Sequence, residues 1–333
     1  MACTIADLLA ARLDICSVLD LQGALHESTV VNGTAFTANY SLVLLAQALQ
    51  SETSSVPLST LLLSDNLISD DAVALLTPAL RAHSGLRTLA LDGCNLTSAG
   101  AASLSAAVLH PQSRLQTLSM SRNSIGAAGA SAIGAGLLGS TALTGLHLSA
   151  SALGREGAQA LAASLGAGGA PSLAWLTLDA NAVRDEGAAA LAEALARSRG
   201  GALTSLDLGY NHITGTGTTA LAAALAAGRE ASRASGLRRL WLNSNEAGDV
   251  GAAALADALG RNRVLQTLSV YGNGISRRGA DALARALQRN RALGQLLGLP
   301  HNDVPIEVAD AISADTMRNS NGRARARGGA WRG

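Results

Sequence analysis

The feature that most constrains this chain is an eleven-residue pattern, LxxLxLxxNxL, which recurs eight times. The copies are LSTLLLSDNLI, LRTLALDGCNL, LQTLSMSRNSI, LTGLHLSASAL, LAWLTLDANAV, LTSLDLGYNHI, LRRLWLNSNEA and LQTLSVYGNGI. A Gly/Ala/Leu-rich stretch such as GAAALAEAL follows each copy, and successive copies are 28 to 34 residues apart. Repeats of this length are typical of solenoids, in which each repeat is one supersecondary unit.

The two halves of each repeat predict two kinds of secondary structure. Leucines at alternating positions 4 and 6 indicate a short strand with one face turned inward, and leucines at helical spacing indicate a helix that faces the same core. Neither element buries its apolar face alone, so neighbouring repeats must stack. The predicted fold class is α/β: a horseshoe-shaped solenoid with a concave parallel β-sheet and convex α-helices.

The LxxLxLxxN strand, the unit of about 28 to 30 residues and the full helix resemble the ribonuclease-inhibitor type of leucine-rich repeat. That type also occurs in the sensor region of NOD-like receptors and in Ran GTPase-activating proteins. The resemblance implies a concave surface that binds a protein partner. Similarity to the GTPase activators implies a small GTPase as an alternative partner, with Arg122 and Asn123 in SRNSIG as the best match to a polar turn group. The acidic tail of that family is replaced here by a basic one.

The pattern divides the chain into four regions. Residues 1–55 are predicted to form an N-terminal helical cap, residues 56–292 the eight repeats, and residues 293–318 a degenerate repeat with a C-terminal cap. The degenerate copy, LLGLPHNDV, reaches Asn302 only if its register slips by one residue. Residues 319–333 are Gly/Arg-rich, have little to bury and are predicted to be disordered.

The ninth position of the pattern predicts a structural ladder of side chains. Its asparagines can bond the backbone of the turn that leaves each strand and that of a neighbouring turn. Cys94 and Ser151 occupy the same position as small polar substitutes, which suits a structural role better than a catalytic one. The asparagines assigned to this ladder are Asn66, Asn123, Asn181, Asn211, Asn245 and Asn273.

The aromatic residues indicate a binding surface. Positions 3, 5, 7 and 8 face the concave side or its rim, and four of the aromatic side chains fall there, in successive repeats: Trp175, Tyr210, Trp241 and Tyr271. Exposed Trp and Tyr are enriched in binding hot spots. Polar residues on the same predicted surface are His147, Asp179, Asp207 and Arg239, and Asp207 and Arg239 could pair on its rim. We therefore expect a scaffold without enzymatic activity that binds a protein partner.

Chemical alternatives find little support in the sequence. His147 near Ser119 and Asp179 suggests a catalytic triad, but the expected open sheet offers no oxyanion hole. All 25 basic residues are arginine, so the glycine-rich strings have no lysine with which to bind phosphate. The six histidines form no metal motif. No metal or cofactor is expected.

Charge and cysteine content indicate the cellular compartment of the protein and the classes of partner that it can contact. The net charge is +1, but residues 318–333 hold five arginines, so the body is mildly acidic and nucleic-acid contact is expected only from the arginine-rich tail. Cys3, Cys16 and Cys94 form no CxxC motif, and the polar N-terminus does not resemble a signal peptide. The expectation is a reduced, cytoplasmic protein, with the nucleus as an alternative and no contact with membrane.

Overall fold

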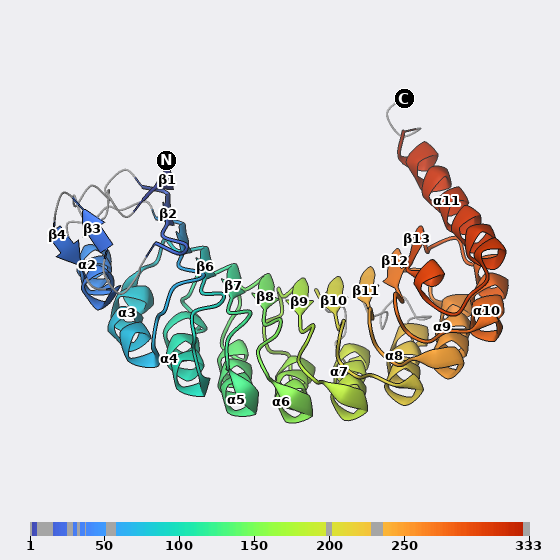
Figure 1. Ribbon diagram of the computed structural model, residues 1–333, viewed down its shortest axis with the longest axis horizontal. Coiled ribbons are helices and arrows are strands. Elements are labelled where there is room, and N and C mark those ends of the chain that lie inside the picture. Colours follow the sequence, from blue (N-terminus) through green and yellow to red (C-terminus); the bar gives the residue numbers. More distant parts are fainter. Residues whose placement is uncertain are drawn as a thin grey trace. The chain divides into compact units, whose positions relative to one another are not determined.

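The computed structural model describes residues 2–4, 16–24, 29–31, 34–36, 38–50, 58–197, 202–227 and 236–328. These residues form two compact units. Unit 1 comprises residues 1–153 and 167–175, and unit 2 comprises residues 154–166 and 176–333. In each unit, short parallel strands form one layer and helices form the other (Figure 1).

Unit 1 has a parallel sheet in the order β1-β2-β5-β6-β7-β8. The strands are β1 (Ala2–Cys3), β2 (Val18–Asp20), β5 (Thr60–Leu62), β6 (Thr88–Ala90), β7 (Thr117–Ser119) and β8 (Gly145–His147). The helices are α2 (Ala38–Gln50), α3 (Asp70–Ala82), α4 (Ser98–Val108) and α5 (Gly126–Leu137), and β3 (Thr29–Val31) pairs antiparallel with β4 (Thr34–Phe36). The segment predicted to be a helical cap thus also supplies two strands of the sheet.

Unit 2 repeats the same alternation. Its strands β10 (Ser205–Asp207), β11 (Arg239–Trp241), β12 (Thr267–Ser269) and β13 (Gln295–Leu297) pair in chain order and are parallel. Its helices are α6 (Gly154–Gly166), α7 (Arg184–Arg197), α8 (Gly215–Ala226), α9 (Gly248–Arg261), α10 (Arg277–Leu287), the short 3₁₀ helix η1 (Leu299–His301) and α11 (Ile306–Gly328). Strand β9 (Trp175–Thr177) contains the boundary between the units.

The core of each repeat is thin and made of leucine and alanine. Leu206 of β10 and Leu208 after it are fully buried, as is Leu221 of α8, which faces them from the helix layer. The alternation of leucines along the strand and their helical spacing afterwards therefore bury both elements against each other. The predicted α/β leucine-rich repeat solenoid is confirmed.

Asn211 shows what the ninth position does. Its Nδ2 donates to the carbonyl oxygens of Leu178 and Gly209, both at 2.9 Å. Its Oδ1 accepts from the backbone amides of Asn181 at 2.9 Å and Val183 at 3.1 Å. One buried amide thus satisfies four backbone groups in two successive turns, which water cannot reach.

The two substitutes at this position act differently from asparagine. The Cys94 thiol donates to the Leu63 carbonyl at 3.1 Å, and the Ser151 hydroxyl donates to the Met120 carbonyl at 3.2 Å. Burial raises the pKa of the Cys94 thiol to about 11, so the thiol stays protonated at neutral pH. Cys94 is free, whereas Cys16 is disulfide-bonded, which corrects the prediction that all three cysteines are reduced.

The ladder continues into the degenerate repeat. Asn302 donates to the Val270 carbonyl at 2.9 Å and accepts from the Asn273 amide at 2.8 Å. The extra residue that shifts the register is taken up by the turn at Gly298, whose φ is +86°, and by η1. The slip required by the sequence is therefore an insertion after β13 and leaves the ladder intact.

A second asparagine ladder, which the eleven-residue pattern does not predict, lies at the other end of the helices in unit 2. Asn290 donates to the carbonyls of Leu259 and Asn262 at 2.7 and 3.0 Å. Asn319 is buried and donates to the carbonyls of Asn290 and Leu293 at 2.9 and 2.8 Å. The dipeptide Arg-Asn recurs at 261–262, 289–290 and 318–319, one repeat apart, and this recurrence was the available signal.

Asn319 is the first residue of the segment that the sequence predicts to be a disordered tail. Helix α11 continues through Gly328, ten residues into the segment assigned to disorder. Arginine and alanine both have high helix propensity, so a composition with little to bury can still continue a helix that a ladder asparagine anchors. Residues 329–333 lie outside the described part of the chain.

Candidate functional site

The outward side of the sheet in unit 2 carries an aromatic and acidic surface. We call it the unit 2 strand face and define it by Asp207, Tyr210, Trp241, Asn243 and Tyr271. The two residues at position 5, Asp207 and Trp241, are Cα partners in the register of β10 and β11. Strand side chains alternate between faces, so these two project outward next to each other, while Leu206 and Leu240 point into the core.

Tyr210 is the most exposed aromatic side chain in the described residues, at 60%. Its backbone is in the left-handed region, with φ +54°, and its amide donates to the Asn243 carbonyl at 2.7 Å. Glycine holds the same turn position at Gly93 and Gly272, where φ is +62° and +59°. The other repeats hold this position with non-glycine residues at similar φ, namely Asp65, Arg122, Ala150, Ala180 and Ser244. The left-handed backbone is therefore a property of the repeat, and what distinguishes Tyr210 is a large aromatic side chain that stays exposed.

Tyr271 is less accessible than the sequence suggests. Its ring packs on that of His301, with centroids 4.2 Å apart, and 43% of the residue remains exposed. Asn243 accepts a hydrogen bond from the Ser269 hydroxyl through its Oδ1. These contacts fix one side of the face, and Trp241, which is half-buried, lies beside them.

Asp207 is the electrostatic centre of the unit 2 strand face. Its carboxylate accepts from the Gly209 amide at 2.9 Å. Burial raises the pKa of its carboxyl from 3.8 to about 6; the Gly209 hydrogen bond opposes the rise, and the Asp179 carboxylate adds to it. A titratable group shifted in this way on an accessible surface marks a candidate site.

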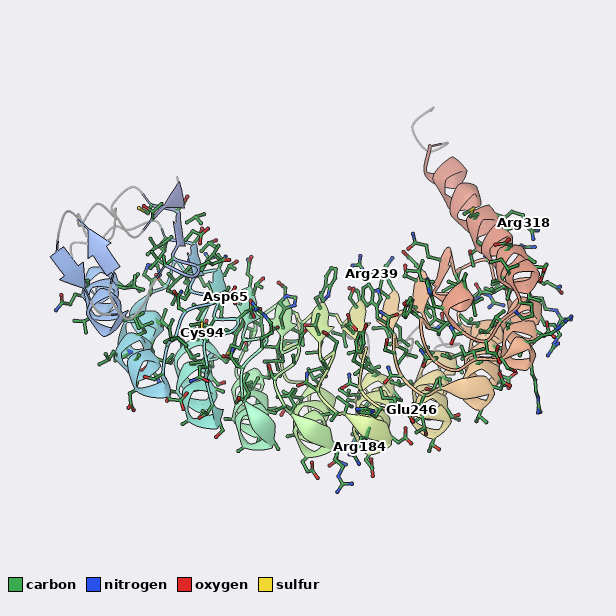
Figure 2. The ribbon with its side chains drawn as sticks, viewed as in Figure 1. Asp65, Cys94, Arg184, Arg239, Glu246 and Arg318 are labelled. Carbon is green, nitrogen blue, oxygen red and sulfur yellow. The ribbon has the colours of Figure 1, made fainter. Side chains whose placement is uncertain are left out.

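The expected pair between Asp207 and Arg239 is absent from the described residues. Arg239 lies opposite Ser205 in the register of β10 and β11, and its Nε donates to the Ser205 hydroxyl at 2.8 Å. Asp207 lies two residues after Ser205, so the register places Arg239 opposite Ser205 and not opposite Asp207. Figure 2 shows Arg239 in the strand layer, away from the helices.

The remaining predicted contact residues lie elsewhere. Trp175, the first residue of β9, is 38% exposed and belongs to unit 1. His147 ends β8, also in unit 1, beside Ser119. The Ser119 hydroxyl donates to the Asp92 carboxylate at 2.5 Å, so it is directed toward an acceptor rather than toward a histidine base.

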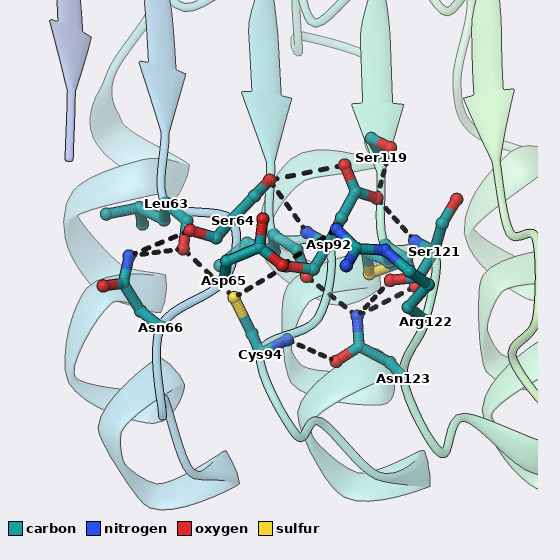
Figure 3. Close-up of polar contacts among 12 residues, drawn as sticks. Leu63, Ser64, Asp65, Asn66, Asp92, Cys94, Ser119, Ser121, Arg122 and Asn123 are labelled. Atoms are coloured by element: carbon teal, nitrogen blue, oxygen red, sulfur yellow. Dashed lines mark hydrogen bonds and ion pairs between the residues drawn. The ribbon is translucent and has the colours of Figure 1, made fainter. Parts of the chain in front are cut away.

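Asp92 organises a polar network in unit 1 that is structural (Figure 3). Its carboxylate accepts from the Ser64 hydroxyl at 3.3 Å and from the Ser121 amide at 2.7 Å, while the Ser64 hydroxyl accepts from the Asp92 amide at 3.1 Å. The Ser121 hydroxyl accepts from the Ser149 amide at 3.1 Å. Position 7 therefore satisfies backbone amides from repeat to repeat, a role that the eleven-residue pattern does not predict.

Arg122, the residue after Ser121, makes another contact between repeats. Its guanidinium pairs with the Asp65 carboxylate at 2.9 Å, and both side chains are about half exposed. The pair passes over Gly93, where an added Cβ would lie 2.7 Å from Asp65 Oδ1. The glycine of the middle repeat thus permits an ion pair between the repeats on either side of it.

The described residues contain neither a candidate metal-binding cluster nor a candidate membrane-spanning helix. No group of three His, Cys, Asp or Glu side chains in that part of the chain is arranged to hold a metal ion. None of the described helices combines the length and the hydropathy that crossing a bilayer requires.

The raised pKa of Asp207 predicts a specific pH dependence of stability. Between pH 4 and pH 6 the folded chain retains a proton that the unfolded chain has lost, so this carboxyl destabilises the fold progressively as the pH rises through that window. We expect Asp207→Asn to raise the free energy of unfolding by about 1 kcal/mol at pH 7.5, after discounting for partial exposure, and by much less at pH 4. Urea titrations at both pH values test this. An equal change at both would contradict it.

Comparison with known proteins identifies the repeats. The family model described as leucine rich repeat matches residues 84–105, 114–134, 203–222 and 261–284. No curated protein sequence is similar enough to count as a relative. One similar structure is the actin-binding site 2 of leiomodin-1, with 20% identity and a TM-score of 0.38, covering 44% of this chain and 80% of that one. Another is the yeast Rad7 and Elc1 complex, with 16% identity and a TM-score of 0.45, covering 88% of this chain and 57% of the matched chain.

Proposed function

We propose that this leucine-rich repeat protein is a scaffold that binds a protein partner on the strand side, and that the unit 2 strand face is the centre of contact. The observation that carries the proposal is Tyr210, the most exposed aromatic residue of the described part of the chain, beside the aromatic residue Trp241 of the next repeat. Tyrosine and tryptophan are the residues most enriched in interface hot spots.

The location of the face supports a macromolecular partner. Tyr210 follows β10, and Trp241 belongs to the neighbouring strand β11; adjacent strands are about 4.8 Å apart, and the side chains at positions 3 and 5 project to one face of the sheet. Such a surface is broad and open, whereas small-molecule sites are concave pockets that enclose most of the ligand. Two large aromatic side chains beside a carboxylate form the centre of an interface, with Arg239 on the same side of the sheet at position 3.

Tyr210→Gly gives a test that separates binding from folding. Removing the strained side chain is expected to leave the fold as stable or more stable, by up to about 1 kcal/mol, because glycine accepts a positive φ without strain. The same change is expected to abolish or strongly reduce capture of the partner from native cell extract. Trp241→Ala is expected to have the same effect on capture.

Val250→Ala is the matched control. Val250 is 69% exposed in α9, on the helix side of the same unit, so its loss should leave the captured proteins unchanged. Identical lists of captured proteins from wild type, Tyr210→Gly and Trp241→Ala would overturn the proposal. Urea titration of each variant shows whether any loss of capture arises from unfolding.

A GTPase-activating role is the alternative function. Arg122 would carry it, and its guanidinium is engaged with Asp65, so it would have to leave this ion pair to reach a nucleotide phosphate. Stimulation of GTP hydrolysis by a Ran-like GTPase, lost in Arg122→Ala and retained in Tyr210→Gly, would favour the alternative. The nearby Asp92 network supports the turns and would be unaffected by that substitution.

A further inference from the structure

The carboxylate of Asp207 lacks a countercharge in the described residues. Its hydrogen-bond donor is the neutral Gly209 amide, and the charged group that acts on it most is Asp179, which carries the same sign. The Arg239 side chain of the neighbouring strand contacts Ser205 instead. The unit 2 strand face therefore presents a half-buried negative charge that a partner can neutralise.

The surroundings of Asp207 limit the shape of the group that can reach it. Trp241 stands next to it on β11, as its Cα partner. Gly209 lies two residues after Asp207, just past the end of β10, and an added Cβ there would lie 3.3 Å from Asp207 Oδ1 and 3.4 Å from the Asn243 carbonyl oxygen. The Trp241 indole therefore lies on one side of the Asp207 carboxylate, and the backbone of Gly209, which has no side chain, lies beyond it.

We propose that the partner contacts this face through an arginine side chain, whose guanidinium pairs with the Asp207 carboxylate and stacks on the Trp241 indole. This inference rests on the proposed function, because it names the chemistry of the partner at the same surface. Tyr210, in the turn after β10, borders the position that the aliphatic part of the arginine would occupy.

Arginine fits this arrangement better than lysine. A guanidinium is planar, donates two parallel hydrogen bonds to a carboxylate and stacks on aromatic faces, whereas an ammonium acts as a compact, strongly hydrated charge. A carboxylate beside an indole offers both interactions to one guanidinium. The like charge of Asp179 strengthens the attraction for any cation but does not distinguish between the two.

The test uses three peptides of sequence acetyl-Gly-Ser-Gly-Xaa-Gly-Ser-Gly-amide, in which Xaa is arginine, lysine or the neutral isostere citrulline. They are titrated into the full chain labelled with ¹⁵N, and the indole N–H resonances are followed by NMR. The chain has three tryptophans, so the Trp241 resonance can be assigned with Trp241→Phe. The arginine peptide is expected to shift this resonance with an affinity at least fivefold above that of the lysine peptide, and citrulline is expected to leave it unchanged.

Asp207→Asn is expected to reduce the affinity for the arginine peptide at least fivefold and to remove the arginine preference. Asp257→Asn is the matched control, because Asp257 is an exposed carboxylate on α9 of the same unit. For wild type, the affinity should fall between pH 7.5 and pH 5, as Asp207 becomes protonated, and this fall should be absent in Asp207→Asn.

Equal affinities for the arginine and lysine peptides, or an unchanged affinity in Asp207→Asn, would overturn the inference. Either result is distinct from failure of the proposed function, which is decided by capture with Tyr210→Gly and Trp241→Ala. If Tyr210→Gly and Trp241→Ala lose capture but the arginine and lysine peptides bind equally well, the unit 2 strand face still binds the partner, and the inference of an arginine contact is wrong.

Discussion

Asn211→Ala is expected to lower the free energy of unfolding by about 3–5 kcal/mol. The change removes one amide that serves four backbone groups, two carbonyls at 2.9 Å and two amides at 2.9 and 3.1 Å. Asn211 is fully buried, so water does not replace the lost partners, and each orphaned group costs about 1–3 kcal/mol. Urea unfolding followed by circular dichroism measures the loss.

Two further variants serve as comparisons for this loss in the free energy of unfolding. Asn211→Ser retains a donor, as Ser151 does at the equivalent position, but loses the acceptor for Asn181 and Val183, so an intermediate loss is expected. His212→Ala is the neighbouring control: its side chain is exposed, and Ala182 holds the same slot with a similar φ, so we expect a change below about 0.5 kcal/mol. If Asn211→Ala were no more destabilised than His212→Ala, the ladder would have no role in stability.

Gly298→Ala is the second prediction with a large effect. Gly298 absorbs the extra residue of the last repeat with φ +86°, and a Cβ there would lie 2.4 Å from Tyr271 Cα and 2.5 Å from Tyr271 N. Backbone atoms cannot rotate away, so β13 and η1 must shift. We expect a loss of about 3 kcal/mol or more, from the clash together with the positive φ.

Gly274→Ala separates the two contributions. Gly274 also has a positive φ, +64°, but nothing lies within 4 Å of an added Cβ, so only the conformational term applies, about 1 kcal/mol. Hydrogen exchange should show faster opening of β13 and loss of the Asn302 contacts in Gly298→Ala alone. Similar losses in the two variants would mean that the close approach to Tyr271 carries no cost.

The candidate site was predictable in part. The repeat frame placed Trp241 and Tyr210 outward from position alone, because strand side chains alternate between faces. Position does not reveal what each side chain touches: Tyr271 packs on His301, thirty residues later, and Arg239 bonds Ser205 rather than Asp207. The repeat frame predicts that position 7 faces the contact surface, whereas Ser64, Asp92 and Ser121 at this position satisfy backbone amides.

The sequence by itself determined the solenoid, because the period of leucines and asparagines specifies each strand, turn and helix locally. Only the tertiary structure decided how the repeats meet. The insertion at Gly298, the second ladder through Asn290 and Asn319, and the unneutralised Asp207 all depend on residues in adjacent repeats. Those relations are set by register and by the approach of backbones, which a local pattern does not contain.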